Sequence, residues 1–274
     1  GYNTTGNAAA VLPDNRRSYA SVQYGAKIII FGGVVQDGTN TNEVWEFDTV
    51  ANVWSERVTT GTKPESRDQT SAVLYGDKMI IFGGNSADVN PSRRLNDVWE
   101  LDLTTNAWTE ISVGGSISKR MNHRAVMDGT DMVVFGGFTE DGKWSTGDAN
   151  GVFKVDLSAA SPTWETIIAD GTTVAPSGRQ AFSMIVKGRE LIVFGGYSTS
   201  EKLNDLWKVD LSISSPTWQQ LTASNSPIAR KGHVVVLYGD KMVLFGGYKE
   251  DIPRLLNDVW EIDLSASSLA WSQV

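Results

Sequence analysis

Five arginines recur along the chain at almost even spacing, and they are the residues best suited to chemistry. Guanidinium groups bind carboxylates and phosphates through paired, charge-assisted hydrogen bonds. A repeated arginine therefore indicates either a set of anion-binding groups or a structural role, in which each arginine pairs with an acidic residue or a loop carbonyl of its own repeat. The sequence leaves both roles open. The five arginines are Arg16, Arg67, Arg120, Arg179 and Arg230.

Further residues near these arginines fall outside the repeat and are harder to explain by fold alone. Arg124 and Lys231 add positive charge beside two of the arginines. Trp144 lies off the repeat in the longest loop, where it is either a cover for its own repeat or a contact residue. We count all three among the candidate binding residues.

Charge is distributed unevenly around the repeat. The five stretches that lead into the arginines hold ten basic and four acidic residues, whereas the five stretches after each glycine pair hold twelve acidic and six basic ones. If both sets of loops leave one face of the fold, they form a basic mouth inside an acidic rim. Such a field attracts anionic groups more strongly than the net charge of −8 suggests.

Composition excludes several kinds of chemistry. The chain has no cysteine, so it has neither thiolate metal ligands nor a thiolate nucleophile. Its only histidines, His123 and His233, each lie three residues after a repeat arginine, where a structural role is expected. We therefore expect no metal site, no cofactor and no catalytic residues. The negative net charge argues against nucleic acid as a partner, and apolar runs such as 28–31 are too short to cross a membrane.

The elements that must position these residues follow from a second repeat. Phe-Gly-Gly occurs five times, at spacings of 51, 53, 59 and 51 residues, and periods near 50 residues are typical of propellers or solenoids. Each unit contains four short runs rich in β-branched and aromatic residues, separated by turn residues, which predicts a four-stranded antiparallel meander. The glycine pairs are expected to permit close backbone approach rather than to bind phosphate. The motif starts at Phe31, Phe82, Phe135, Phe194 and Phe245.

This pattern resembles the kelch motif, in which an arginine opens strand one and an aromatic residue with Gly-Gly closes strand two. The resemblance implies an all-β, kelch-type β-propeller of five four-stranded antiparallel blades, with strand one lining a central channel. We expect a single propeller over residues 1–274. Its repeats should span about 16–58, 67–111, 120–168, 179–221 and 230–274, with 1–15 as a closure segment across the seam between the first and last units.

The resemblance also implies a function. Substrate-adaptor members of the kelch family hold acidic peptides on the face formed by the loops from strand four to strand one and from strand two to strand three. We therefore expect a monomeric, non-catalytic protein-interaction module that binds a partner segment, such as an acidic peptide, around a basic channel mouth. The alternative is a propeller enzyme, or a protein that binds a small anionic ligand or sugar at that mouth. The sequence leaves the compartment open.

Overall fold

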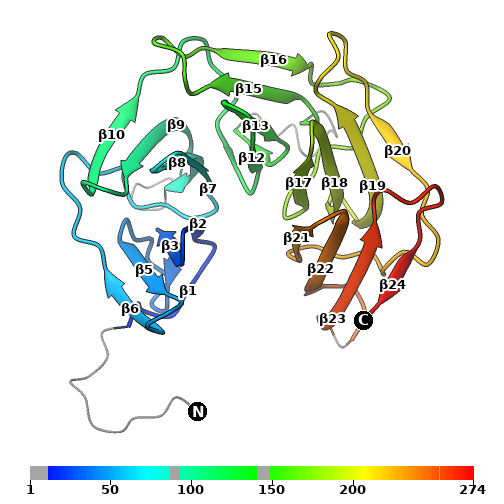
Figure 1. The fold of residues 1–274 in the computed structure, drawn as a ribbon, viewed down its shortest axis with the longest axis horizontal. Helices are drawn as coiled ribbons and strands as arrows, with labels where there is room; N and C mark the ends of the chain where they lie inside the picture. The colour runs from blue at the N-terminus through cyan, green and yellow to red at the C-terminus, as the bar shows by residue number, and fades with distance from the viewer. Residues whose placement is uncertain (1–11, 87–92, 141–148, 253) are drawn as a thin grey trace, which may run out of the picture. The chain divides into compact units, whose positions relative to one another are not determined.

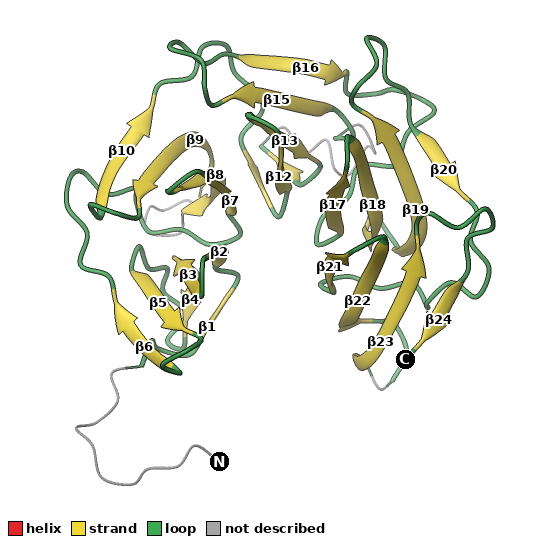
Figure 2. Cartoon of the chain, viewed as in Figure 1, coloured by secondary structure: helices red, strands yellow, loops and turns green. Residues whose placement is uncertain are grey.

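The chain folds into strands, turns and loops. The computed structural model describes residues 12–86, 93–140, 149–252 and 254–274, and none of these residues is helical (Figure 2). It follows that the described chain has no long apolar helix with which to cross a membrane. The strands form five four-stranded antiparallel sheets in chain order, which confirms the predicted all-β propeller with five blades (Figure 1). Of the predicted closure segment, residues 1–11 lie outside the described residues.

The blades fall into two compact units, Gly1–Ser112 and Val113–Val274, and the single-domain organisation of the chain stays a prediction. The first unit holds blades one and two. Blade one consists of β2 (Ala20–Tyr24), β3 (Lys27–Phe31), β5 (Val44–Asp48) and β6 (Val53–Glu56). Blade two consists of β7 (Ser71–Tyr75), β8 (Lys78–Ser86), β9 (Arg93–Asp102) and β10 (Ala107–Ile111).

The second unit holds blades three, four and five. Blade three consists of β12 (Arg124–Asp128), β13 (Asp131–Phe135), β15 (Val152–Asp156) and β16 (Trp164–Ile168). Blade four consists of β17 (Ser183–Lys187), β18 (Glu190–Tyr197), β19 (Lys202–Asp210) and β20 (Gln219–Leu221). Blade five consists of β21 (Val234–Tyr238), β22 (Lys241–Tyr248), β23 (Leu255–Asp263) and β24 (Trp271–Gln273).

Two short ladders lie at the loop end of the blades. In blade one, β1 (Arg16–Arg17) pairs with β4 (Val34–Val35), and in blade three, β11 (Arg120–Met121) pairs with β14 (Phe138–Thr139). Single bridges replace these ladders in the other blades, joining Asp68 to Asn85, Gln180 to Tyr197 and Lys231 to Tyr248. In every blade, therefore, the residue after the repeat arginine is fixed beside the residue after the glycine pair.

The glycine pairs let neighbouring blades approach through their backbones. Gly33 donates its N–H to the carbonyl oxygen of Arg67 in the next blade at 2.9 Å. Gly32 has a φ of +69°, and a Cβ on it would lie 2.6 Å from that same oxygen. A side chain at Gly32 would thus clash with backbone and also strain the left-handed conformation. This geometry agrees with the structural role predicted for the glycine pairs.

Aromatic side chains fill the space between consecutive blades of one unit. The Phe that precedes each glycine pair packs against the strand-four Trp of the following blade, with ring centroids 5.0–5.2 Å apart. Offset and tilted rings at this separation are favourable beyond the area that they bury. The pairs are Phe31 with Trp108, Phe135 with Trp218 and Phe194 with Trp271.

The residue three positions after the repeat arginine lies in the same layer. Phe182 of blade four contacts Phe135 of blade three edge-on, and His233 of blade five contacts Phe194 of blade four in the same way. Each of these inter-blade contacts thus joins one Phe to two residues of the next blade.

Ion pairs between strands two and three fix the register within each blade. In blades one, two and five the lysine comes from strand two and the glutamate from strand three, as in Lys78–Glu100 at 2.8 Å. In blades three and four the polarity is reversed. There Lys154 and Lys208 of strand three pair with Asp131 and Glu190 of strand two. Opposite charges across a ladder contribute roughly 0.2–1 kcal/mol each.

Candidate functional site

The repeat arginines tie the loop into strand one to the rest of its own blade. Arg67 donates from Nε to the carbonyl oxygen of Glu65 at 3.1 Å and from Nη1 to that of Gly83, the first glycine of the pair, at 3.1 Å. The other four arginines make the same two bonds with acceptors at the same sequence offsets. Each guanidinium therefore fixes the conformation of two loops at once.

A carboxylate two residues before the strand-three Trp completes this arrangement. Asp97 accepts bonds from Nη1 and Nη2 of Arg67 at 2.7 and 2.8 Å, and its Oδ2 also accepts the indole N–H of Trp99 at 2.7 Å. Bidentate pairs of this kind are among the strongest charge-assisted hydrogen bonds. Asp205 and Asp258 do the same in blades four and five, and Glu43 pairs with Arg16 and Trp45 in blade one.

The pKa values of these carboxyl groups reflect the pairing. Burial alone would raise the pKa of Asp97, but the hydrogen bonds and charge of Arg67, with the indole N–H of Trp99, hold it below the usual value. The same balance lowers the pKa of Asp205 through Arg179 and Trp207. Both groups are therefore ionised at neutral pH, and each neutralises its arginine.

Blade three departs from this pattern at two positions together. Gly151 stands where the acidic residue is expected, and Phe153 stands where the other blades have Trp. Arg120 keeps its bonds to Ser118 and Gly136, and its guanidinium lies over the ring of Phe153, 5.0 Å from the centroid. Because the side chain of Phe153 has no N–H group, it needs no carboxylate acceptor at position 151. Blade three thus lacks both the indole N–H and the carboxylate that accepts it in the other blades.

The repeat arginines are deeply buried. Arg67, Arg179 and Arg230 have no exposed surface and Arg120 has 1%, while the side chain of Arg16 is 3% exposed. This burial, with the contacts above, favours the structural one of the two roles left open by the sequence. It also places much of the predicted basic and acidic charge within ion pairs, since the carboxylates come from the stretches after the glycine pairs.

The candidate residues outside the repeat have different surroundings. Arg124, the first residue of β12, donates from Nε to the carbonyl oxygen of Phe182 at 2.9 Å and has no ion pair with any described residue. Its burial lowers the pKa of its guanidinium. Lys231 is half-buried, with its ammonium 4.5 Å from the ring centroid of Tyr197 and 5.7 Å from that of Tyr248. Trp144 lies outside the described residues.

Lys231 belongs to a cluster built by the loop ends of blades four and five. Lys202 lies near the same two rings, at 5.9 Å from Tyr197 and 5.1 Å from Tyr248, and forms an ion pair with the exposed Glu250. An ammonium over an aromatic face is stabilised by roughly 0.5–1 kcal/mol at exposed sites. We call Tyr197, Lys202, Lys231 and Tyr248 the tyrosine–lysine cluster. In it, Lys231 forms no ion pair of its own within the described part of the chain.

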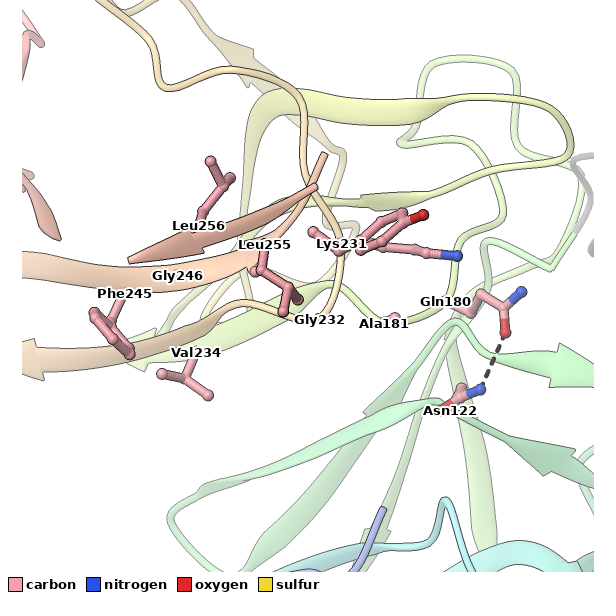
Figure 3. A pocket seen from close by; sticks show the side chains of 12 residues that line it. Asn122, Gln180, Ala181, Lys231, Gly232, Val234, Phe245, Gly246, Leu255 and Leu256 are labelled. Carbon is pink, nitrogen blue, oxygen red and sulfur yellow. Dashed lines mark hydrogen bonds between the residues drawn. The ribbon is translucent and has the colours of Figure 1, made fainter. Parts of the chain in front are cut away.

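A pocket of about 570 Å³ opens beside this cluster, entirely within the second unit. Its polar side is formed by Lys231, Tyr248 and a pair of amides in which Asn122 donates to Gln180 at 3.1 Å (Figure 3). Its apolar side is formed by Val234, Phe245, Leu255 and Leu256 of blade five. A ligand that carries an anionic group next to an apolar group would complement both the polar and the apolar side of this pocket.

The polar side of the pocket is formed by positions at which the side chain differs between blades while the backbone conformation is the same. The residue after the repeat arginine is Arg17, Asp68, Met121, Gln180 or Lys231, while the backbone pairing beside it is the same in each blade. The next residue is left-handed in all five blades, although only Gly232 is glycine, as Ala181 with a φ of 53° illustrates. Non-glycine residues rarely adopt this conformation, so the scaffold dictates it.

Sequence reasoning missed Asn122, Gln180, Tyr197, Lys202 and Tyr248. A contrast in the repeat could have found three of them: Gln180 directly follows a repeat arginine, and Tyr197 and Tyr248 directly follow a glycine pair, at positions where the side chain differs between repeats. The histidines that it did consider are core residues. Burial, followed by the charges of Arg230 and Arg124, lowers the pKa of His233 to about 3, so this side chain is neutral at pH 7. No metal-binding group of His, Asp and Glu occurs in the described ranges.

Four-stranded blades with a buried arginine at each loop end define a β-propeller assembled from repeated units. The chain matches the model of the KLHDC2/KLHL20/DRC7 Kelch-repeats domain over residues 4–119 and 145–274. It therefore belongs to the kelch-repeat family, as its sequence indicated.

Individual relatives agree with this assignment. The chain is 30% identical to human Kelch domain-containing protein 3 over 260 residues, which cover 93% of this chain and 66% of the relative. It is 31% identical to Adagio-like protein 1 of Oryza sativa subsp. japonica over 241 residues, which cover 85% of this chain and 36% of the relative. The chain thus spans about a third to two thirds of the length of these relatives.

A solved structure shares the fold. The structure of YjhT superimposes with a TM-score of 0.73 and covers 94% of this chain and 84% of its own, at 14% identity. At that identity the likeness concerns the fold alone.

Proposed function

We propose that this chain is a non-catalytic protein-interaction module that binds an acidic segment of a partner protein at the loop end of its blades. Kelch-repeat domains are generally interaction modules. The observation that carries the proposal is the tyrosine–lysine cluster with its adjoining pocket, where a cation without an ion-pair partner among the described residues lies beside apolar and amide groups.

In this proposal the repeat arginines act mainly by positioning. Arg179 and Arg230 hold the loops that present Gln180 and Lys231, and these next residues contact the ligand. Arg124 is a second candidate cation, because it has no acidic partner among the described residues. The recognition role predicted for Arg16, Arg67 and Arg120 becomes the same positioning role in their own blades.

The proposal is tested by selecting ligands from a displayed random peptide library and measuring the selected peptides by titration calorimetry. We expect acidic peptides with an apolar neighbour to be enriched. Lys231→Met should weaken their binding about tenfold, equivalent to ~1.4 kcal/mol, because a hydrogen bond to a charged group contributes roughly that much.

Lys241→Met provides the matched control. It removes the same charge from the same blade but at the opposite end, where Lys241 pairs with Glu261 at 2.7 Å. Its affinity should equal that of the wild type. Enrichment of peptides without acidic residues, or equal weakening by both variants, would contradict the proposal.

A second candidate is a small anionic ligand or sugar, favoured by the amide pair of Asn122 and Gln180 in the pocket wall. A thermal-shift screen of monosaccharides and dicarboxylates, repeated on Gln180→Leu, tests it. A stabilising compound whose effect is lost in the variant would support this candidate over the peptide.

A further inference from the structure

We propose that the tyrosine–lysine cluster, together with Arg254, binds the phosphate group of a phosphorylated partner segment, which displaces the side chain of Glu250. This inference rests on the proposed function and names the class of its ligand, a phosphate monoester rather than a carboxylate. The side chains involved come from blades four and five and their loops, so the site lies within the second unit.

The repeated scaffold does not account for the cluster. The residue after the glycine pair is Tyr only in blades four and five, and it is Val34, Asn85 or Phe138 in the other blades. Lysine follows the repeat arginine only in blade five. Because the backbone pairing at these positions is the same in every blade, the fold itself does not require these side chains.

Two ammonium groups share one pair of aromatic rings. Lys231 lies 4.5 Å from the ring centroid of Tyr197 and Lys202 lies 5.1 Å from that of Tyr248, and each ammonium also lies near the other ring. The side chain of Lys202 is only 7% exposed. Like charges held near the same rings repel each other, and an anion that contacts both removes this repulsion.

Glu250 is the anion that the chain itself places beside these cations. Its Oε2 accepts a hydrogen bond from the Lys202 ammonium. This bond and the charge of Lys202, followed by the charges of Arg254 and Lys231, lower the pKa of Glu250. Three cations thus act on a single carboxylate, and neither Lys231 nor Arg254 forms an ion pair with any described residue.

The charge and the donors of this site match a phosphate better than a carboxylate. A phosphate monoester has a charge of about −1.5 to −2 at pH 7 and three acceptor oxygens, so it forms more charge-assisted hydrogen bonds than a carboxylate with such cations. Arg254 donates to the hydroxyl oxygen of Tyr248 at 3.1 Å, which leaves the hydroxyl proton free to bind an anion. We therefore expect Lys202, Lys231 and Tyr248 to donate to the three phosphate oxygens.

Arrays of randomised peptides that carry phosphoserine, glutamate or serine at one fixed position test the proposal, and titration calorimetry then measures the best peptide in all three forms. We expect the phosphoserine form to bind about tenfold more tightly than the glutamate form, and the serine form to bind most weakly. Lys202→Met should bind the phosphoserine and glutamate forms with similar affinity. Lys241→Met, which removes a lysine at the opposite end of blade five, should keep the preference.

Glu250→Gln removes the carboxylate that the phosphate must displace. It should strengthen binding of the phosphoserine form about threefold, because a larger fraction of the molecules then has the site open to the ligand. Asp251→Asn is the matched control. It makes the same change of charge at the next residue, which is exposed and forms no ion pair within the described chain, and it should bind like the wild type.

Circular dichroism checks that each variant is folded, and Lys231→Met replaces Lys202→Met if the latter is not. Equal affinity for the phosphoserine and glutamate forms would overturn this proposal and support the proposed function. Binding of the phosphoserine form alone would support this proposal and contradict an acidic segment as the ligand. A preference that persists in Lys202→Met, or unchanged affinity in Glu250→Gln, would also overturn it. So would binding to vesicles that contain phosphatidylinositol phosphates but to none of the phosphopeptides.

Discussion

At the scale of single residues, the central finding is that four of the five repeat arginines form ion pairs with a carboxylate of their own blade. The pairing partner could have been predicted, because an acidic residue stands two positions before the strand-three Trp in four of the five repeats. The joint exchange to Gly151 and Phe153 in blade three strengthens this interpretation. A ligand-binding arginine would not need its acidic neighbour and its indole neighbour to change together.

Removing one such carboxylate should destabilise the fold. In Asp205→Asn, the charge of Arg179 stays buried without its counter-ion, and a broken buried pair costs about 3 kcal/mol. We expect urea unfolding to shift to lower concentration accordingly. Asp251→Asn, an exposed change to the same residue type, should leave the midpoint within experimental error. Equal urea midpoints for the two variants would contradict the structural role of the arginines and favour a role in recognition.

The residues around Lys231 could not be predicted in the same way. Tyr197 and Lys202 come from blade four, and Lys231 and Tyr248 come from blade five. Sequence spacing does not show that these side chains lie close together. It also does not show that Lys202 forms an ion pair with Glu250. Only the spatial order of the blades brings them together.

At the scale of the strands, sequence was a good guide to structure. Strand two is apolar almost throughout, and in blade two its residues Met79 to Phe82 are buried. Two-residue turns such as Gly25-Ala26 connect strands one and two. Five copies of one pattern reveal the elements reliably, because accidental residues differ between copies while the structural ones recur. The ladders beside the repeat arginines were not predicted, since they are only one or two residues long.

The reversed ion pair in blade three allows a test of register. Lys154→Glu places a carboxylate beside Asp131 and Glu165, which lie 2.9 and 3.6 Å from the Lys154 ammonium in the wild type. It should cost roughly 0.5–1 kcal/mol of the free energy of unfolding, and Asp131→Lys in the same chain should recover most of it. Chemical denaturation of both single variants and the double variant gives the coupling energy. A coupling energy near zero would mean that the pair does not contribute to register.

At the scale of the whole molecule, family membership covers nearly the whole chain, whereas the partner remains a proposal. Relatives that are 30–31% identical share the scaffold. Gln180 and Lys231, which we propose to contact the ligand, stand at a position that differs between repeats, so a match to the family scaffold does not predict them. The residues that determine the blade occur in five copies in this sequence, whereas each candidate contact residue occurs in one blade only. The sequence therefore predicts the fold better than the binding site.

Acid should destabilise the molecule through several blades at once. The pKa values of Asp97, Asp205 and Asp258 are below their usual value in the folded chain. Groups whose pKa is lowered on folding contribute stability above their unfolded pKa of about 4, and this contribution is lost as pH falls through the folded pKa. We expect the melting temperature to be flat from about pH 7 to 5 and to fall steeply below about pH 4. Asp205→Asn should show a shallower fall, and an identical slope would contradict this origin.

The reversed polarity of the strand-two to strand-three pairs has a consequence during folding. Repeated blades have similar strands, so a strand three that meets the strand two of another blade is a characteristic error of repeat proteins. If strand three of blade three met strand two of blade two, Lys154 would face Lys78. If strand three of blade two met strand two of blade three, Glu100 would face Asp131. Both mismatches bring like charges together at diagonal positions of the ladder. We therefore expect the two charge patterns to disfavour pairing of strands from blades three and four with strands from the other three blades.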